Sequence, residues 1–126
     1  MTLFLYAPET TAPWEDVEKA LAATVVPDGN FEIFRTINDL SRKLRQPKKD
    51  LMIIVLFLSD REDMLDVLNI QHLFRNTRVI LVVPDLDEKT IAMAHRLRPR
   101  YLTYVNGNFP ALRTVVEKMR EGYAQA

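Results

Sequence analysis

The stretch Leu51–Leu58 (LMIIVLFL) constrains the fold of this chain most, because a strand made from it is apolar on both faces. Strands of this kind lie in the middle of a parallel sheet, where helices cover both sides. Arg78–Val83 (RVILVV), which Pro84 ends, has the same character. The sequence therefore predicts an α/β domain built on a buried parallel sheet.

Shorter apolar runs and helical periodicities complete the pattern. Three more strands are predicted, at 2–7, 30–34 and 101–105. Between the strands, apolar residues recur at helical spacing and predict helices at 13–24, 37–44, 60–74, 87–97 and 112–123. This alternation predicts a five-stranded parallel sheet with helices on both faces, a flavodoxin-like (β/α)5 three-layer sandwich. All 126 residues are expected to form one domain, 1–126.

The composition narrows the functional classes. Hydrophobic residues make up 48% of the chain and charged residues 27%, as in ordinary soluble globular proteins. Lys plus Arg and Asp plus Glu both count 17, so no net field draws the chain to nucleic acid or to an anionic membrane. The absence of cysteine excludes disulfides and thiol catalysis and fits a reducing cytoplasm. The sequence also has no glycine-rich loop for a nucleotide and no signal-peptide pattern at its start.

The order and lengths of the elements resemble the receiver (CheY-like) domain of two-component response regulators over essentially the whole chain. Lys48–Asp60 (KKDLMIIVLFLSD) is similar to the receiver's third strand and the loop that follows it. Arg78–Gly107 is similar to the receiver's fourth strand through its fifth, and Ala92–Leu102 within it resembles the small-residue helix that leads to the last strand. Tyr101 falls where receivers carry the switch aromatic.

This likeness stops at the residues that carry the receiver's chemistry. Receivers hold magnesium with acidic residues, accept the phosphoryl group on an Asp, and stabilise it with a hydroxyl and a Lys. Here Tyr6–Pro8 replaces the acidic pair, and the phosphoacceptor position falls on Val55 or Leu56. Val83 replaces the hydroxyl residue and Tyr104 replaces the Lys. The resemblance therefore implies a degenerate pseudo-receiver, not an enzyme, without aspartyl phosphorylation or a bound metal.

Acidic residues follow the two most apolar strands, and two interpretations stay open. Asp60 and Asp87 stand where helix caps are expected, and Glu62 and Asp63 fall in a first helical turn, where the helix dipole favours negative charge. Alternatively, Asp60 and Asp85 meet at the carboxyl edge of the sheet and bind magnesium or accept phosphate. The chain would then be an atypical phosphoacceptor or a small enzyme.

A basic cluster made of His95, Arg96, Arg98 and Arg100 lies at the end of the fourth predicted helix. Cations are favoured at a helix C-terminus, but the run is longer than a cap needs, so contact with an acidic partner or a phosphate is the other interpretation. His72 and His95 lack a second ligand at helical spacing, which argues against a metal site. We predict five partner-binding residues: His95, Arg98, Arg100, Tyr101 and Tyr104.

The leading hypothesis is a cytoplasmic, non-catalytic signalling or regulatory module that binds another signalling protein or a second copy of itself. The expected surface comprises the fourth helix, the fifth strand and the fifth helix. No cofactor, no membrane contact and no direct nucleic-acid binding are expected. A third alternative is another small α/β regulator, such as an antisigma-factor antagonist, in which an edge strand would run antiparallel.

Overall fold

The structure is a computed structural model that describes residues 2–8, 18–19, 21–23, 30–46, 52–58, 60–75, 77–104 and 114–119. The predicted helices at 13–24 and 112–123 lie partly outside these residues, as does Val105 of the predicted fifth strand. Residues 18–19, 21–23 and 114–119 are helical.

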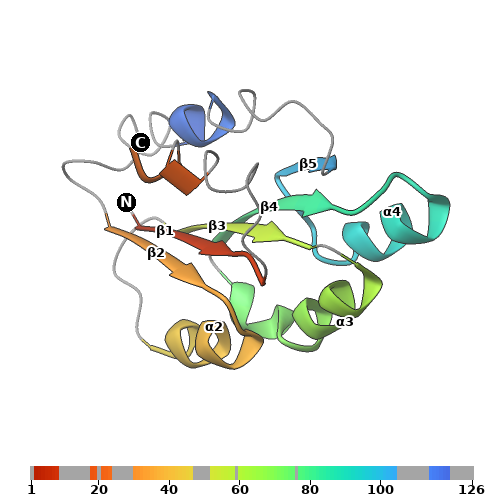
Figure 1. Cartoon of the computed structure of the whole chain (residues 1–126), viewed down its shortest axis with the longest axis horizontal. Coiled ribbons are helices and arrows are strands. Elements are labelled where there is room, and N and C mark those ends of the chain that lie inside the picture. Colours follow the sequence, from red (N-terminus) through yellow and green to blue (C-terminus); the bar gives the residue numbers. More distant parts are fainter. Residues whose placement is uncertain are drawn as a thin grey trace.

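The described strands form one parallel sheet (Figure 1). It contains β1 (Thr2–Tyr6), β2 (Asn30–Phe34), β3 (Met52–Phe57), β4 (Thr77–Val83) and β5 (Tyr101–Tyr104). The strand order is β2-β1-β3-β4-β5, and every neighbouring pair runs parallel. This is the flavodoxin-like order shared by receivers, which confirms the predicted fold class. No strand of the described sheet runs antiparallel, as the edge strand of an antisigma-factor antagonist would.

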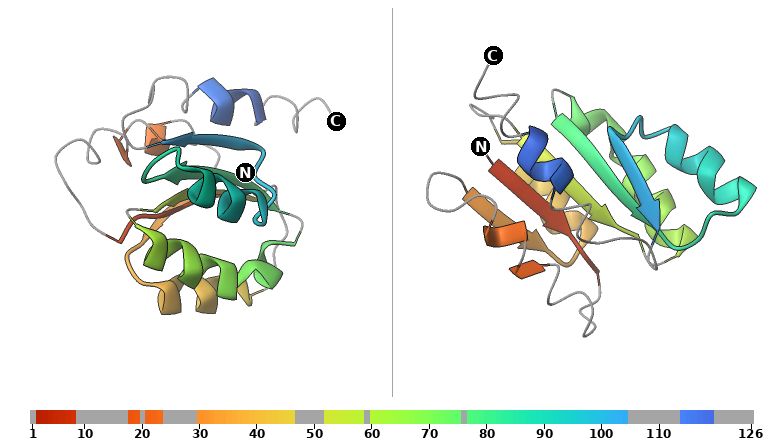
Figure 2. Two further views of the ribbon diagram at one scale, coloured as in Figure 1. Left: turned by 90° about the vertical axis from the view of Figure 1, so that its right-hand side faces the viewer. Right: turned by 90° about the horizontal axis from the view of Figure 1, so that it is seen from above.

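Helices lie on both faces of the sheet (Figures 1 and 2). On one side are α2 (Ile37–Leu44) and α3 (Arg61–Asn69), followed by the 3₁₀-helix η1 (Gln71–Phe74). The helix α4 (Glu88–His95) connects β4 to β5. The helical residues 18–19, 21–23 and 114–119 lie over the other face.

Alternate strand residues supply two separate cores, because side chains of a strand point to opposite faces in turn. One core joins the sheet to α2, α3 and α4 and includes Phe4, Ile54, Leu81, Leu40, Val67 and Ala94. The other joins the sheet to the helical residues of the opposite face and includes Leu3, Ile53, Ile80, Leu21 and Val116. All residues of β3 are buried, as its apolar sequence predicts.

The predicted helix at 60–74 is too long. The helix α3 ends at Asn69, because Ile70 leaves helical geometry at φ −113° and ψ 15°. The Ile70 N–H donates to the Val67 carbonyl oxygen at 3.1 Å, a three-residue spacing that tightens the chain into η1. Phe74 remains in the same core as α3, which explains why its apolar periodicity resembled a continuing helix.

Among the described residues, no helix has the length and apolar character needed to cross a membrane.

Candidate functional site

At the carboxyl edge of the sheet, where ligands bind in folds of this class, the described ends of β1, β3 and β4 are buried and largely apolar. The Leu58 N–H donates to the Val82 carbonyl oxygen at 2.9 Å, so the chain stays in register with the sheet one residue past β3. Leu58 and Val83 are fully buried, and Tyr6 is only 3% exposed. Side chains of this kind leave little room or polarity for an ion between β1, β3 and β4.

The two positions that resemble the receiver's phosphoacceptor lie inside β3. Val55 and Leu56 are both fully buried. They belong to the cores on opposite faces of the sheet. Neither side chain carries an oxygen that could attack phosphorus or bind a divalent cation.

Tyr6 stands where receivers carry acidic residues. Burial is the main cause that raises the pKa of Tyr6 to about 12, and the negative charges of Asp63, Asp66 and Asp60 raise it further. The phenol is therefore neutral at physiological pH. It cannot supply the negative oxygen that a magnesium ion would need.

Asp60 begins α3 as its N-cap. Its Oδ1 accepts a hydrogen bond from the Asp63 N–H at 2.9 Å, which satisfies one of the free donors at the helix start. Glu62 and Asp63 occupy the first turn, where negative charge is favoured. The capping interpretation of Asp60 is thus confirmed.

The start of α4 differs from this pattern, and the predicted capping role of Asp87 is wrong. Asp87 occupies the N-cap position but makes no side-chain cap hydrogen bond. Instead, the Asp85 Oδ1 accepts from the Asp87 N–H at 2.9 Å, and Asp87 Oδ2 lies 3.7 Å from Arg61 Nη2. An extended Asp87, with φ −60° and ψ 151°, lets the preceding Asp85 fold back onto the chain.

Asp85 is ionised over a wider pH range than an ordinary carboxyl. Its pKa is lowered first by the Thr90 hydroxyl, then by the Asp87 amide, with a smaller contribution from Arg61, against a desolvation effect that raises it. The Thr90 hydroxyl is buried, and within the described part of the chain its oxygen completes no hydrogen bond of normal geometry. We therefore attribute its effect on Asp85 to a nearby dipole.

The carboxylates at this edge are each engaged by the protein itself. Asp60 caps α3, Asp85 accepts from a backbone amide, and Asp87 pairs with Arg61. In the ranges that the structure describes, no three His, Cys, Asp or Glu side chains gather as metal ligands. The arrangement serves to start two helices and to join α3 to α4.

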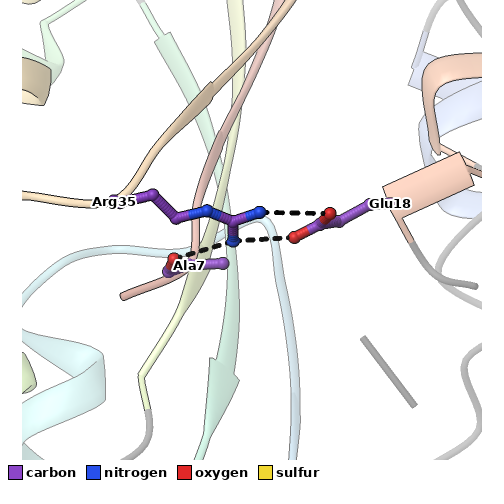
Figure 3. Close-up of polar contacts among 3 residues, drawn as sticks. All are labelled: Ala7, Glu18 and Arg35. Carbon is purple, nitrogen blue, oxygen red and sulfur yellow. Dashed lines mark hydrogen bonds and ion pairs between the residues drawn. The ribbon is translucent and has the colours of Figure 1, made fainter. Parts of the chain in front are cut away.

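Arg35 ties the ends of β1 and β2 to the neighbouring helical segment (Figure 3). Its Nη1 donates to the Ala7 carbonyl oxygen at 3.0 Å and to Glu18 Oε1 at 2.8 Å, and its Nη2 donates to Glu18 Oε2 at 3.3 Å. The Glu18 side chain is only 12% exposed. This two-point contact is a structural clamp at the carboxyl edge.

The predicted basic residues lie at the opposite, amino edge of the sheet. His95 closes the last turn of α4, and Arg98 and Arg100 lead into β5; all three are exposed. The Arg100 N–H donates to the Val79 carbonyl oxygen at 2.7 Å, which fixes this segment beside the start of β4. Arg98 has a positive φ of 52°, a conformation that glycine adopts more easily than arginine.

The two predicted tyrosines do not share one surface. Tyr101 begins β5 and packs against the core that contains Leu21 and Val116, whereas Tyr104 ends β5 and packs against the core of α3 and α4. Both are partly buried. The structure therefore brings Tyr101 close to Arg98 and Arg100 along the chain, and places Tyr104 at the carboxyl edge.

One basic residue at the amino edge was missed. Arg75 is exposed and leads into β4, the strand next to β5. Neighbouring parallel strands begin at the same edge, so the position of Arg75 before a predicted strand could have revealed it.

Comparison of the chain with protein-family models, with curated proteins and with solved structures found no match. The functional conclusions therefore rest on the fold and on the geometry of these two edges.

Proposed function

We propose that this protein is a cytoplasmic, non-catalytic signalling or regulatory module: a pseudo-receiver that binds another signalling protein or a second copy of itself. The binding surface is the amino edge at the end of α4 and the start of β5, where His95, Arg98, Arg100 and Tyr101 lie.

The observation that carries this proposal is the filling of the carboxyl edge. The receiver order of strands is present, yet Leu58 and Val83 are fully buried at the ends of β3 and β4, and Tyr6 is a neutral phenol at the end of β1. Phosphoryl transfer needs metal ligands and a nucleophilic carboxylate at this edge. A domain that has the receiver's strand order but lacks the residues for phosphoryl transfer is best suited to binding another protein.

The amino edge offers the more suitable surface for a partner. Arg98 and Arg100 are exposed, and neither forms an ion pair or side-chain hydrogen bond with the described residues. Tyr101 adds a partly buried aromatic ring next to them. Arginine and tyrosine are enriched in the residues that dominate protein interfaces.

The alternative is an atypical phosphoacceptor that uses Asp60 and Asp85. One observation favours it: the two residues follow neighbouring strands, β3 and β4. Against it, both carboxylates already accept backbone hydrogen bonds at helix starts. The ends of β4 and β5 carry Val83 and Tyr104, where a receiver has its hydroxyl residue and its Lys.

The test of the proposed function is the double variant Arg98→Ala with Arg100→Ala. Both side chains are exposed, so the fold should be retained, whereas truncation of Tyr101 would also disturb a core. We expect weaker self-association in sedimentation velocity or weaker capture of an identified partner. Lys89→Ala is the matched control, because Lys89 is an exposed cation at the other end of α4. Equal behaviour of the double variant and the wild type in both assays would contradict the proposal.

A further inference from the structure

Four arginines lie in the segments that lead into β4 and β5 at the amino edge of the sheet. Because these strands are parallel neighbours, the segments that lead into them lie at the same side of the sheet (Figure 2). The Arg100 N–H donates to the Val79 carbonyl oxygen at 2.7 Å, which anchors the segment before β5 against β4. We call Arg75, Arg96, Arg98 and Arg100 the arginine edge.

The described residues leave the guanidinium groups of the arginine edge without a partner. All four residues are exposed, and none forms an ion pair or side-chain hydrogen bond with the described part of the chain. Arg78 behaves differently, since its Nη1 donates to the Met119 carbonyl oxygen at 3.3 Å. Within the described ranges, the lack of a side-chain partner is therefore a feature of these four positions and not of every arginine near the edge.

Helix dipoles do not account for the arginine edge. Arg96 is the C-cap of α4, where a cation is favoured by the helix C-terminus. Arg98 and Arg100 lie beyond the helix, and Arg75 follows η1 in an extended conformation with φ −60° and ψ 136°. The positive φ of Arg98, 52°, belongs to the turn that ends α4, where the Arg98 N–H donates to the His95 carbonyl oxygen at 3.1 Å.

We infer that the arginine edge binds a carboxylate-rich segment of a partner protein. This inference rests on the proposed function, which supplies a protein partner, and it adds the chemistry of that partner. Arginine presents a planar fork that matches a carboxylate at two points, so a cluster made of arginine favours Asp and Glu side chains.

A protein segment suits this edge better than nucleic acid does. The chain has equal numbers of basic and acidic residues, 17 of each, so no overall field attracts a polyanion. The opposite edge of the same sheet carries Asp60, Asp85 and Asp87. A short acidic segment can contact the arginine edge alone, whereas a long nucleic acid would also approach those carboxylates.

The test measures fluorescence anisotropy of a labelled glutamate-rich peptide at low salt. The wild type should bind this peptide and should not bind a lysine-rich peptide of the same length. The double variant Arg98→Glu with Arg100→Glu, and separately Arg75→Glu, should weaken binding about tenfold or more. Lys89→Glu should stay within about twofold of the wild type, because Lys89 lies at the start of α4, away from this edge. Circular dichroism melts of each variant exclude loss of folding as the cause.

Each outcome decides the inference. Absence of binding to the glutamate-rich peptide, or an equal loss with Lys89→Glu, overturns it. Tighter binding of a charge-matched single-stranded DNA than of the peptide also overturns it, because the edge would then serve polyanions in general. If the peptide fails to bind while Arg98→Ala with Arg100→Ala still weakens association, the acidic partner is wrong and the proposed function stands.

Discussion

Tyr6 shows at the scale of one residue how burial keeps the end of β1 uncharged. Its aromatic ring belongs to the core of α2 and α3, and its hydroxyl is close enough to the acidic start of α3 to be influenced by Asp63, Asp66 and Asp60. A group buried beside negative charges remains in its neutral form.

This environment predicts a specific alkaline instability. Because the folded-state pKa of Tyr6 is raised from 10.0 to about 12, the phenol contributes stability that is fully present below pH 10 and is lost as the pH approaches 12. We expect the wild type to lose about 2 kcal/mol of unfolding free energy relative to Tyr6→Phe across this range. Urea unfolding of both proteins at several pH values measures the difference. Parallel curves for the two proteins would show that the phenol titrates as freely as in the unfolded chain.

At the scale of elements, the starts of α3 and α4 are stabilised in different ways. Asp60 accepts from the Asp63 N–H as a cap, whereas at α4 the equivalent contact comes from Asp85, two residues before the Asp87 N–H. Asp87 contributes an ion pair to Arg61 in which both side chains are largely exposed.

Two alanine substitutions distinguish these arrangements. Asp60→Ala removes a cap and should lower the unfolding free energy by about 1 kcal/mol. Asp87→Ala removes only an exposed ion pair and should cost less than about 0.5 kcal/mol. Denaturant midpoints of the two variants, compared with the wild type, show which substitution lowers the unfolding free energy more. A larger loss for Asp87→Ala would mean that its side chain caps α4 in solution.

The elements themselves were largely predictable from sequence. The apolar run Leu51–Leu58 predicts β3 within one residue at each end, and the periodicity of Ile37, Leu40 and Leu44 predicts α2. The errors came where one residue changes the backbone path. At Ile70 the helical geometry ends, so the last part of the predicted helix is η1 instead. At Asp87 the backbone is extended, and the Asp87 N–H donates to the Asp85 carboxylate.

Over the whole molecule, the parallel sheet separates the candidate functional residues into two edges. Arginines that are distant in sequence, such as Arg75 and Arg100, lie at the same amino edge because β4 and β5 are neighbours. Tyr101 and Tyr104, although close in sequence, are divided by the length and the two faces of β5. Sequence alone could group Arg98, Arg100 and Tyr101, but the pairing of Arg75 with them and the separation of Tyr104 require the strand order.

The most direct test of the central claim is an amide NMR titration of the wild type with beryllofluoride and magnesium, a mimic of the phosphorylated receiver. Because Tyr6, Leu58 and Val83 fill the carboxyl edge with buried side chains, we predict no saturable shifts at the amides of Tyr6, Asp60 or Asp85. Incubation with acetyl phosphate should likewise leave the intact mass unchanged. Saturable, magnesium-dependent shifts at this edge, or a gain of one phosphoryl group, would contradict the account.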